Sequence, residues 1–399
     1  MNNSLEENIY LDYAAATPID SDILRIYKKE LIKNYANASA MHQLGVQSRE
    51  SLEMARYIVA NTIAATPETI IFTRGGTESI NLAILGIAHA HCSNGNHIIT
   101  TKVEHDAVLS CMKHLEQEGF KITYLDVDNS GNISLKDVQA AITDQTILIS
   151  IMSVQNEIGT IYPIQDIGKL ILQYRKKHCT AYPLFHTDAC QAPNYIDLHV
   201  ERMHIDLLSL NGSKIYAPKS SGILYVRKGV VLKKVFFGGN QEKSLRPGTE
   251  DVASSIAFAH AFVKAQSLVQ NESKRLLHLQ QKFISLITKE IPNSILNGPT
   301  VQSNNRIANN INISFLGAEA ETVLIYLDAA GVFAGSGSAC ATDKDEPSHV
   351  LKACHATKAQ LTSSIRFTFG RQTTWKQLQY TVKHLKKIIT RVRSIEQIV

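Results

Sequence analysis

Segments with strand character and segments with helical character alternate along residues 70–227, and this alternation limits the possible folds more than any other feature. Short apolar or β-branched runs predict strands at about 70–73, 97–101, 121–125, 146–153, 182–188, 206–210 and 222–227. Periodic runs predict helices between them, at about 77–91, 107–118, 135–142 and 163–178. Such alternation is typical of α/β proteins with a doubly wound, largely parallel sheet. Ligands of such sheets bind where the carboxyl ends of neighbouring strands converge, so functional residues are expected at the strand tips.

Two strand tips within residues 185–214 carry side chains with complementary chemistry. The run FHTD ends a buried strand at Asp188, and the next strand, LLSL, is followed by a glycine turn and Lys214. A carboxylate and a lysine on neighbouring tips match the needs of pyridoxal phosphate, which takes a lysine Schiff base and an acidic partner for its ring nitrogen. A structural Asp188–Lys214 ion pair explains the same residues equally well, so both interpretations stay open on this stretch alone.

The run IIFTRGGTES joins a strand, two glycines and the start of an apolar helix at Thr77. The N–H groups and the dipole at a helix N-terminus favour an anion such as phosphate. The run has neither the GxGxxG dinucleotide fingerprint nor the Walker GxxxxGK pattern, which favours a single phosphate group. A turn that only caps the helix is the alternative.

Two further strand tips carry polar residues. His105 follows the strand at 97–101, where its ring can stack on a planar cofactor, although a lone histidine is usually plain polar surface. Asn156 lies in the polar run QNEIG that follows the strand at 146–153. In a parallel sheet both tips share one edge with Asp188.

A glycine-rich loop at residues 331–351 contains the run AGSGSACATDKDEPSHVL, with Cys340 among small residues. Buried cysteines normally have apolar neighbours, so Cys340 is predicted to be an exposed thiol with a chemical use. An incidental surface cysteine is the alternative. The other five cysteines form no CxxC pair or regular framework, and they are expected to be reduced thiols of a cytoplasmic protein.

The chain is long enough for two domains. Helices are predicted at 251–264 and 271–289, followed by a smaller α+β unit built from 307–315, 319–330, 364–369 and a helix that starts at Trp375. We place the boundary near residue 260. The large domain then comprises residues 17–259, and the small domain comprises residues 1–16 and 260–399, with the 331–351 loop.

The composition excludes several other classes of protein. Hydrophobic residues make up 44% and charged residues 19% of the chain, as in ordinary soluble globular proteins. The net charge of +5 is spread along the chain, and the run RKK at 175–177 is typical of a solvated helix face, so no direct nucleic-acid binding is expected. No apolar run is expected to span a membrane, and the start, MNNSLEEN, lacks a secretory signal.

Eight motifs, in order along nearly the whole chain, resemble those of the cysteine desulfurases, the pyridoxal-phosphate family that takes sulfur from L-cysteine. They are IYLDYAAATP, NASAMHQLG, IFTRGGTESINLAI, TKVEHDAVL, VQNEIGTIYPI, FHTDACQA, GSGSACATDKDEPSHVLKA and SSIRFTFGR. The last two resemble the nucleophile loop of the long-loop class and the substrate-arginine strand. The resemblance implies the aspartate aminotransferase-like fold (fold type I), a homodimer with a sheet-based large domain and a smaller terminal domain.

The resemblance assigns catalytic roles to three residues. It implies that Lys214 holds the cofactor as a Schiff base and later moves the Cα proton. It implies that His105 stacks on the cofactor ring and serves in proton transfer. Cys340, as a thiolate, attacks the sulfur of the bound cysteine, which leaves a persulfide on Cys340 and releases L-alanine.

The other implied roles concern binding. Asp188 keeps the pyridine nitrogen protonated, and Gln191 bonds the phenolic oxygen. The implied phosphate donors are Gly76, Thr77, Asn211, Ser213 and, from the other subunit, Thr249. Arg366 holds the substrate carboxylate as a bidentate fork, and Asn156 lies near both substrate and cofactor. No metal and no membrane are expected, and the implied partners are L-cysteine, a second copy of the chain and an unidentified sulfur-acceptor protein.

The chain departs from the family pattern at several positions. The family usually has Asn where Tyr13 stands, and Ala38 and Ala40 depart from its Asn-Pro-Ser-Ser-x-His loop. Directly before the lysine, the family has Ser-x-His where this chain has Asn211 and Ser213, both of which can still donate hydrogen bonds. The family's Pro-Lys-Gly turn also ends in serine here, in the run PKS at 218–220.

Other functions stay open beside a desulfurase. One is a selenocysteine lyase-like enzyme, and the other is a catalytically weakened homologue that binds the cofactor and acts through partners. The chain ends at Val399 without the longer tail that some relatives use to dock an iron–sulfur scaffold, so that partner is not implied. The destinations considered for the sulfur are iron–sulfur clusters, thiolated tRNA, other cofactors and modified DNA.

Overall fold

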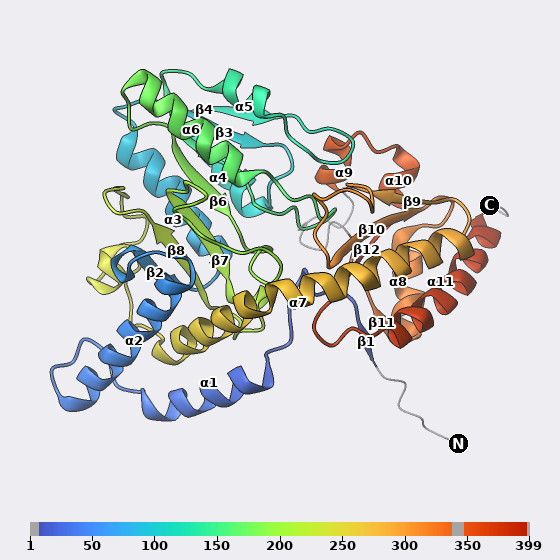
Figure 1. Ribbon diagram of the computed structural model, residues 1–399, viewed down its shortest axis with the longest axis horizontal. Helices are drawn as coiled ribbons and strands as arrows, with labels where there is room; N and C mark the ends of the chain where they lie inside the picture. Colours follow the sequence, from blue (N-terminus) through green and yellow to red (C-terminus); the bar gives the residue numbers. More distant parts are fainter. Residues whose placement is uncertain (1–7, 337–346, 397–399) are drawn as a thin grey trace.

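A computed structural model describes residues 8–336 and 347–396 of the chain (Figure 1). Cys340 and residues 337–346 of the predicted 331–351 loop therefore lie outside the described residues.

The central element is a seven-stranded sheet with strand order β2-β8-β7-β6-β5-β3-β4. Its strands are β2 (Ile70–Thr73), β3 (His97–Thr101), β4 (Lys121–Leu125), β5 (Thr146–Ser150), β6 (Leu184–Asp188), β7 (Leu207–Asn211) and β8 (Gly222–Val226). The strands from β7 to β4 are parallel, whereas β8 is antiparallel to both of its neighbours. The predicted α/β fold with a mostly parallel sheet is confirmed.

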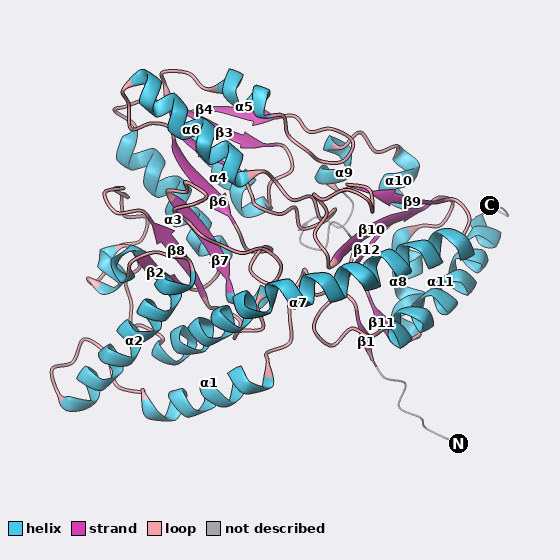
Figure 2. Cartoon of the chain, in the orientation of Figure 1, coloured by secondary structure: helices cyan, strands magenta, loops and turns pink. Residues whose placement is uncertain are grey.

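Helices cover both faces of this sheet (Figure 2). They are α1 (Ser21–Lys33), α2 (Gln43–Thr62), α3 (Gly76–His91), α4 (Asp106–Gln117), α5 (Leu135–Ala141), α6 (Ile164–His178) and α7 (Val252–Glu290). Side chains alternate between the two faces of a strand. Ile98 and Leu148 therefore pack in one apolar cluster with α3 and α4, while Ile99 and Ile149 pack in another with α2, α6 and α7.

Helix α7 is one continuous helix of 39 residues, so the prediction of two helices at 251–264 and 271–289 is wrong. The polar residues around Asn271 do not end the helix, because each half is held by a different core. Phe258 and Phe262 pack under the large sheet, whereas Leu279 and Phe283 pack under the second sheet. Tertiary packing of this kind overrides weak local preferences.

The continuity of α7 also changes one expectation about membranes. By length and composition alone α7 is long and apolar enough to cross a membrane, contrary to the sequence expectation. However, 56% of the tested window is buried inside the protein, as in a core helix.

The second part of the chain forms a three-stranded antiparallel sheet of order β12-β10-β9, beyond the C-terminal half of α7 (Figure 1). Its elements are β9 (Ser294–Asn297), β10 (Asn310–Phe315), α8 (Ala320–Ala329), α9 (His349–Ala353), α10 (Lys358–Thr362), β12 (Ser364–Thr368) and α11 (Trp375–Glu396). The short strands β1 (Ile9–Tyr10) and β11 (Val332–Phe333) pair in parallel beside it. The predicted boundary near residue 260 falls inside α7 and stays a prediction.

Candidate active site

The carboxyl ends of β6 and β7 place Asp188 and Lys214 at one edge of the large sheet. Asp188 is the last residue of β6 and pairs with Ser209 of β7. Lys214 ends the short turn η2 (Gly212–Lys214), which directly follows β7. Asp188 is buried, and its Oδ1 accepts a hydrogen bond from the Cys190 N–H at 2.9 Å. The acidic group and the lysine that the sequence singled out are therefore neighbours in the fold.

The backbone carbonyl of Ala14 brings Lys214 together with Gln191. The Lys214 Nζ donates to the carbonyl oxygens of Ala14 at 2.7 Å and Ala15 at 2.5 Å. The Gln191 Nε2 donates to the same Ala14 oxygen at 3.0 Å. Because both side chains reach one oxygen atom, their polar ends lie side by side.

The N-terminus of α3 packs against the same edge. A Cβ atom at Gly76 would lie 2.6 Å from the Cys190 Sγ and 3.6 Å from the Asn211 Nδ2, so the helix start touches the tips of β6 and β7. Gly75 precedes the helix with φ +141°, and no side chain of the described residues caps it. Thr77 is exposed in its first turn. The N–H groups of such a helix start suit a phosphate.

The two residues that replace the family pattern before the lysine bond to each other. Asn211 Oδ1 accepts from both the N–H and the Oγ of Ser213, at 3.0 Å each. The Asn211 amide lies at the start of α3, with its Oδ1 3.7 Å from a Cβ atom built at Gly75 and its Nδ2 3.6 Å from one built at Gly76. The Ser213 hydroxyl thus orients Asn211.

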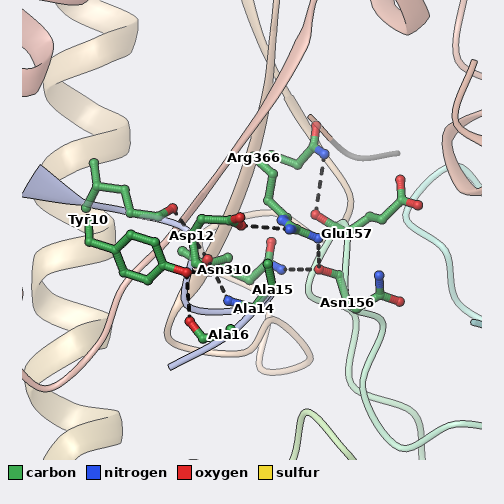
Figure 3. Close-up of polar contacts among 12 residues, drawn as sticks. Tyr10, Asp12, Ala14, Ala15, Ala16, Asn156, Glu157, Asn310 and Arg366 are labelled. Atoms are coloured by element: carbon green, nitrogen blue, oxygen red, sulfur yellow. Dashed lines mark hydrogen bonds and ion pairs between the residues drawn. The ribbon is translucent and has the colours of Figure 1, made fainter. Parts of the chain in front are cut away.

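Arg366 of β12 lies with Asp12 on one side and Asn156 on the other (Figure 3). Its Nη2 forms an ion pair with the Asp12 Oδ1 at 2.8 Å, and its Nη1 donates to the Asn156 carbonyl oxygen at 3.2 Å. Asn310 also donates to that oxygen, at 2.9 Å. The predicted neighbours Arg366 and Asn156 are in contact, while sequence reasoning missed Asp12, whose only signal is a carboxylate directly before the small-residue run YAAAT.

His105 is the N-cap of α4, where its Nδ1 accepts from the Ala107 N–H at 3.1 Å. The preceding residue, Glu104, is completely buried and accepts hydrogen bonds from the Met152 N–H and the Thr101 hydroxyl. Burial raises the pKa of Glu104 to about 8, and the nearby charge of Asp188 adds to the rise. The carboxyl of Glu104, which follows β3, therefore interacts electrostatically with Asp188 at the end of β6.

Two residues that sequence reasoning missed tie the end of the 331–351 loop to the site. Ser348 Oγ donates to the Glu157 Oε2 at 2.5 Å and, as N-cap of α9, accepts from the Leu351 N–H at 3.1 Å. Burial raises the pKa of the Glu157 carboxyl. The sequence signals were a serine after proline before a helix, and the glutamate next to Asn156.

The other described end of this loop also contacts the site. The backbone of Gly335 exchanges two hydrogen bonds with that of Arg366, at 2.8 and 3.1 Å. Beside Ser348, the His349 Nε2 lies 3.0 Å from the Glu104 carbonyl oxygen, next to His105. Both ends of the segment that contains Cys340 are thus bonded to residues at or beside the candidate substrate site.

Thr249 lies exposed in the loop at residues 236–250. This loop is held to the protein by an ion pair between Arg246 and Glu78 of α3, at 2.9 Å. The predicted contact of Thr249 with the other subunit's phosphate stays a prediction.

The assembled side chains fit pyridoxal phosphate. The start of α3 with Thr77 and the Asn211 amide offers donors for a phosphate, Lys214 offers an amine, and Asp188 offers an acid for the ring nitrogen. A Cβ atom at Gly75 would find no neighbour closer than 3.7 Å, which leaves space at the turn. Across residues 8–336 and 347–396, no three His, Cys, Asp or Glu side chains gather as possible metal ligands.

Comparisons with known sequences agree with this geometry. The family model of the class-V aminotransferases matches residues 9–381. The chain is 43% identical over 391 residues to the cysteine desulfurase IscS of Dictyoglomus turgidum, covering 98% of this chain and 97% of that protein. It is 39% identical over 387 residues to the cysteine desulfurase IscS of Methanosarcina thermophila, covering 97% and 93%.

Solved structures show the same relationship. A NifS-like protein superposes with a TM-score of 0.88 at 29% identity, covering 96% of this chain and 100% of that one. SspA, solved in complex with cysteine, superposes with a TM-score of 0.76 at 34% identity, covering 90% and 98%. The expected fold type I is confirmed. This chain belongs to the class-V aminotransferase family and, within it, to the cysteine desulfurases, which use pyridoxal phosphate to remove sulfur from cysteine.

Proposed function

We infer that this desulfurase transfers the sulfur of L-cysteine to the thiolate of Cys340, releases L-alanine, and passes the persulfide sulfur to an acceptor protein. It acts as a homodimer in the cytoplasm. Cys340 lies outside the described residues, so its role rests on its position in the glycine-rich loop.

Each described residue has a task in this reaction. Pyridoxal phosphate, when bound, supplies an electron-withdrawing ring that stabilises negative charge on the substrate Cα. Asp188 would keep the ring nitrogen protonated, and Gln191 would donate to the phenolic oxygen. Arg366 binds the substrate carboxylate. Lys214 would hold the cofactor through its amine, and that amine would move the Cα proton of the substrate, with His105 assisting proton transfer.

The sulfur transfer balances without a further reactant. The Cys340 thiolate attacks the substrate sulfur, and an S–S bond forms as the substrate C–S bond breaks. The electrons of that bond stay with the carbon, which takes a proton and becomes the methyl group of alanine. Cysteine and a thiol are thereby converted to alanine and a persulfide.

One observation carries the residue assignment. The polar ends of Lys214 and Gln191 meet at the Ala14 carbonyl, on the edge of the sheet where Asp188 ends β6. A lysine, an acid and a neutral donor at one edge match the three polar demands of the cofactor ring.

The homodimer is supported by large apolar side chains left exposed on α1, on α2 and between them, including Leu31, Ile32, Tyr35, Met41 and Tyr57. Exposed apolar groups that gather in one region commonly mark protein interfaces. The cytoplasm is supported by the cysteines of the described residues, which are free thiols, as in reducing compartments. Iron–sulfur cluster assembly and tRNA thiolation are the uses of the sulfur that we propose.

The test follows alanine formation and persulfide labelling after L-cysteine is added to the parent protein, Cys340→Ser and Lys214→Ala. The parent is expected to form both products. Cys340→Ser is expected to keep the spectral response to cysteine and to lose the persulfide, because cofactor and substrate binding do not use the thiol. Cys92→Ser, which removes an exposed thiol on the far end of α3, is the matched control and is expected to behave like the parent.

Three outcomes contradict the proposal in different ways. Near-normal alanine formation by Cys340→Ser favours a selenocysteine lyase-like enzyme. If borohydride reduction still attaches the cofactor covalently to the Lys214→Ala variant, the assignment of Lys214 as the Schiff-base lysine is wrong. A parent protein that binds the cofactor but forms no alanine is the catalytically weakened homologue.

A further inference from the structure

Residues 9–17, here named the N-terminal strap, connect the two sheets at the active site. At one end, the Leu11 N–H donates to the Phe333 carbonyl oxygen, and the Leu11 carbonyl accepts from the Thr368 N–H, both at 2.7 Å. At the other end, the Thr17 N–H donates to the Ser213 carbonyl oxygen at 2.8 Å, next to Lys214. The backbone that carries Asp12 is therefore fixed on both sides of this residue.

Asp12 is the counter-charge of the arginine that we assign to the substrate. The Arg366 side chain is 4% exposed and the Asp12 side chain 19%, and their ion pair is 2.8 Å long. A buried guanidinium is strongly unfavourable without such a partner. The Glu157 carboxyl also interacts with Arg366, but burial raises its pKa and so weakens it as a counter-charge.

The substrate carboxylate has to bind a guanidinium that already donates two hydrogen bonds within the protein. A bidentate carboxylate takes two N–H groups on one side of the guanidinium. In Arg366, Nη2 donates to Asp12 and Nη1 donates to the Asn156 carbonyl, so part of that capacity is in use (Figure 3). The Nε of Arg366 is buried and has no hydrogen-bond partner among the described residues, so it is open to a second carboxylate. A bidentate carboxylate that takes Nε together with Nη2 shares Nη2 with Asp12, and the two negative charges repel each other.

We propose that Asp12 competes with the substrate carboxylate for Arg366, and that this competition sets how tightly the enzyme holds L-cysteine and the product L-alanine. The inference rests on the proposed function, because it takes Arg366 as the carboxylate-binding residue. If Asp12 competes, a neutral residue at position 12 strengthens amino-acid binding. If the Asp12–Arg366 ion pair is only structural, its loss weakens amino-acid binding.

The test titrates the cofactor-loaded enzyme with L-alanine, which carries the same carboxylate and has no sulfur to lose, and follows the visible absorbance of the cofactor. Asp12→Asn keeps the size of the side chain and an acceptor oxygen for Nη2, but removes the charge. It is expected to tighten L-alanine binding by about tenfold and to lower the KM for L-cysteine in the same direction, the scale of one hydrogen bond to a charged group. Asp12→Ser is a second neutral variant and is expected to shift binding in the same direction.

Asp22→Asn is the matched control. It removes one negative charge from a side chain that is 56% exposed and whose ion pairs are with Arg25 and Lys264, so L-alanine binding is expected to stay at the parent value. Thermal midpoints of all variants report whether each protein is folded.

The competition is overturned if both neutral variants, folded and loaded with cofactor, bind L-alanine as weakly as the parent or more weakly. Arg366→Lys separates this result from a failure of the proposed function. Lysine loses the planar fork, so this variant is expected to weaken L-alanine binding whether or not Asp12 competes. If Arg366→Lys binds L-alanine like the parent, the carboxylate site itself is wrong, and the inference about Asp12 falls with it.

Discussion

At position 213 a serine takes the place of the histidine in the family pattern, and the structure gives this serine a different partner. Its hydroxyl donates to the Asn211 Oδ1, the same oxygen that accepts from its N–H. The hydroxyl proton therefore orients Asn211, and the phosphate donor we assign is the Asn211 amide. On this assignment the substitution moves the phosphate contact from residue 213 to Asn211, so a donor remains at the start of α3.

This assignment predicts unequal effects of two alanine variants on cofactor affinity. Asn211→Ala removes a hydrogen bond to a charged group and is expected to weaken equilibrium binding of pyridoxal phosphate to the apoprotein by roughly tenfold or more. Ser213→Ala removes a neutral hydrogen bond, while the Ser213 N–H still holds Asn211, so a loss of about threefold or less is expected. Equal losses would instead mean that the Ser213 hydroxyl contacts the phosphate itself.

Ser348 carries a second prediction at the scale of one residue. Ser348→Ala removes the cap of α9 and leaves the buried Glu157 carboxyl without its hydroxyl donor. Because this residue lies at the end of the segment that contains Cys340, persulfide formation is expected to slow by roughly ten- to a hundredfold, the scale of a small misplacement of a reacting group. Cofactor content is expected to be unchanged, and Ser348→Thr, which keeps a hydroxyl, should recover most of the rate. If Ser348→Ala forms the persulfide at the parental rate, this hydrogen bond does not contribute to catalysis.

Among the elements, the loop at residues 236–250 is held in a strained shape by a buried ion pair. In the turn η3 (Gln241–Ser244), Glu242, Lys243 and Ser244 all have left-handed φ angles of 44° to 62°, which costs free energy for residues other than glycine. Glu242 offsets this cost because its carboxylate binds Arg56 at 2.7 and 2.8 Å and the Phe72 N–H at 2.8 Å. The loop that carries Thr249 is thereby anchored to α2 and β2.

Breaking this anchor is expected to be costly. Glu242→Gln leaves the Arg56 charge buried and is expected to lower the free energy of unfolding by roughly 3–5 kcal/mol, measured by urea denaturation. Glu53→Gln removes the other carboxylate that pairs with Arg56, but the Glu53 side chain is 56% exposed. A loss below about 1 kcal/mol is expected for this control. Similar losses in the two variants would contradict an anchoring role specific to Glu242.

For the whole molecule, the buried carboxyl of Glu104 makes stability depend on pH. Its pKa is raised by burial to about 8, above its ordinary value of 4.5. The folded state therefore binds the proton more tightly than the unfolded state. This contribution to stability is fully present below pH 4.5 and is lost as the pH rises through 8, with a slope of at most about 1.4 kcal/mol per pH unit.

Glu104→Gln removes this titration and is expected to flatten the alkaline side of the stability profile. The thermal midpoint of the variant, relative to the parent, should rise between pH 5.5 and pH 8.5. Glu50→Gln changes an exposed carboxylate on α2 and serves as the control, with a midpoint that should follow the parent at both pH values. If the profile of Glu104→Gln also runs parallel to that of the parent, Glu104 does not titrate in this range.

The sequence by itself determined the class of the fold and predicted candidate cofactor residues. Alternating strands and helices specify a parallel sheet, and the tips of such strands share one edge, so Asp188 and Lys214 could be placed together before any coordinates. Local signals of this kind predict structure correctly because they depend only on residues that are adjacent in the chain. The same holds for the helix start at Gly76. Gln191 was predicted only from the family resemblance.

Only the tertiary structure decided the contacts between distant segments. Asp12 meets Arg366 across 354 positions, and Glu157 meets Ser348 across 191, so no local pattern could connect them. Lys214 and Gln191 meet on the carbonyl of Ala14, a backbone atom that every residue possesses and that leaves no trace in a sequence. Likewise α7 is continuous because each half packs on its own core. The residue types at a single strand tip can be read from the local sequence. The pairing of charges and the continuity of long elements depend instead on which distant surfaces the fold buries together.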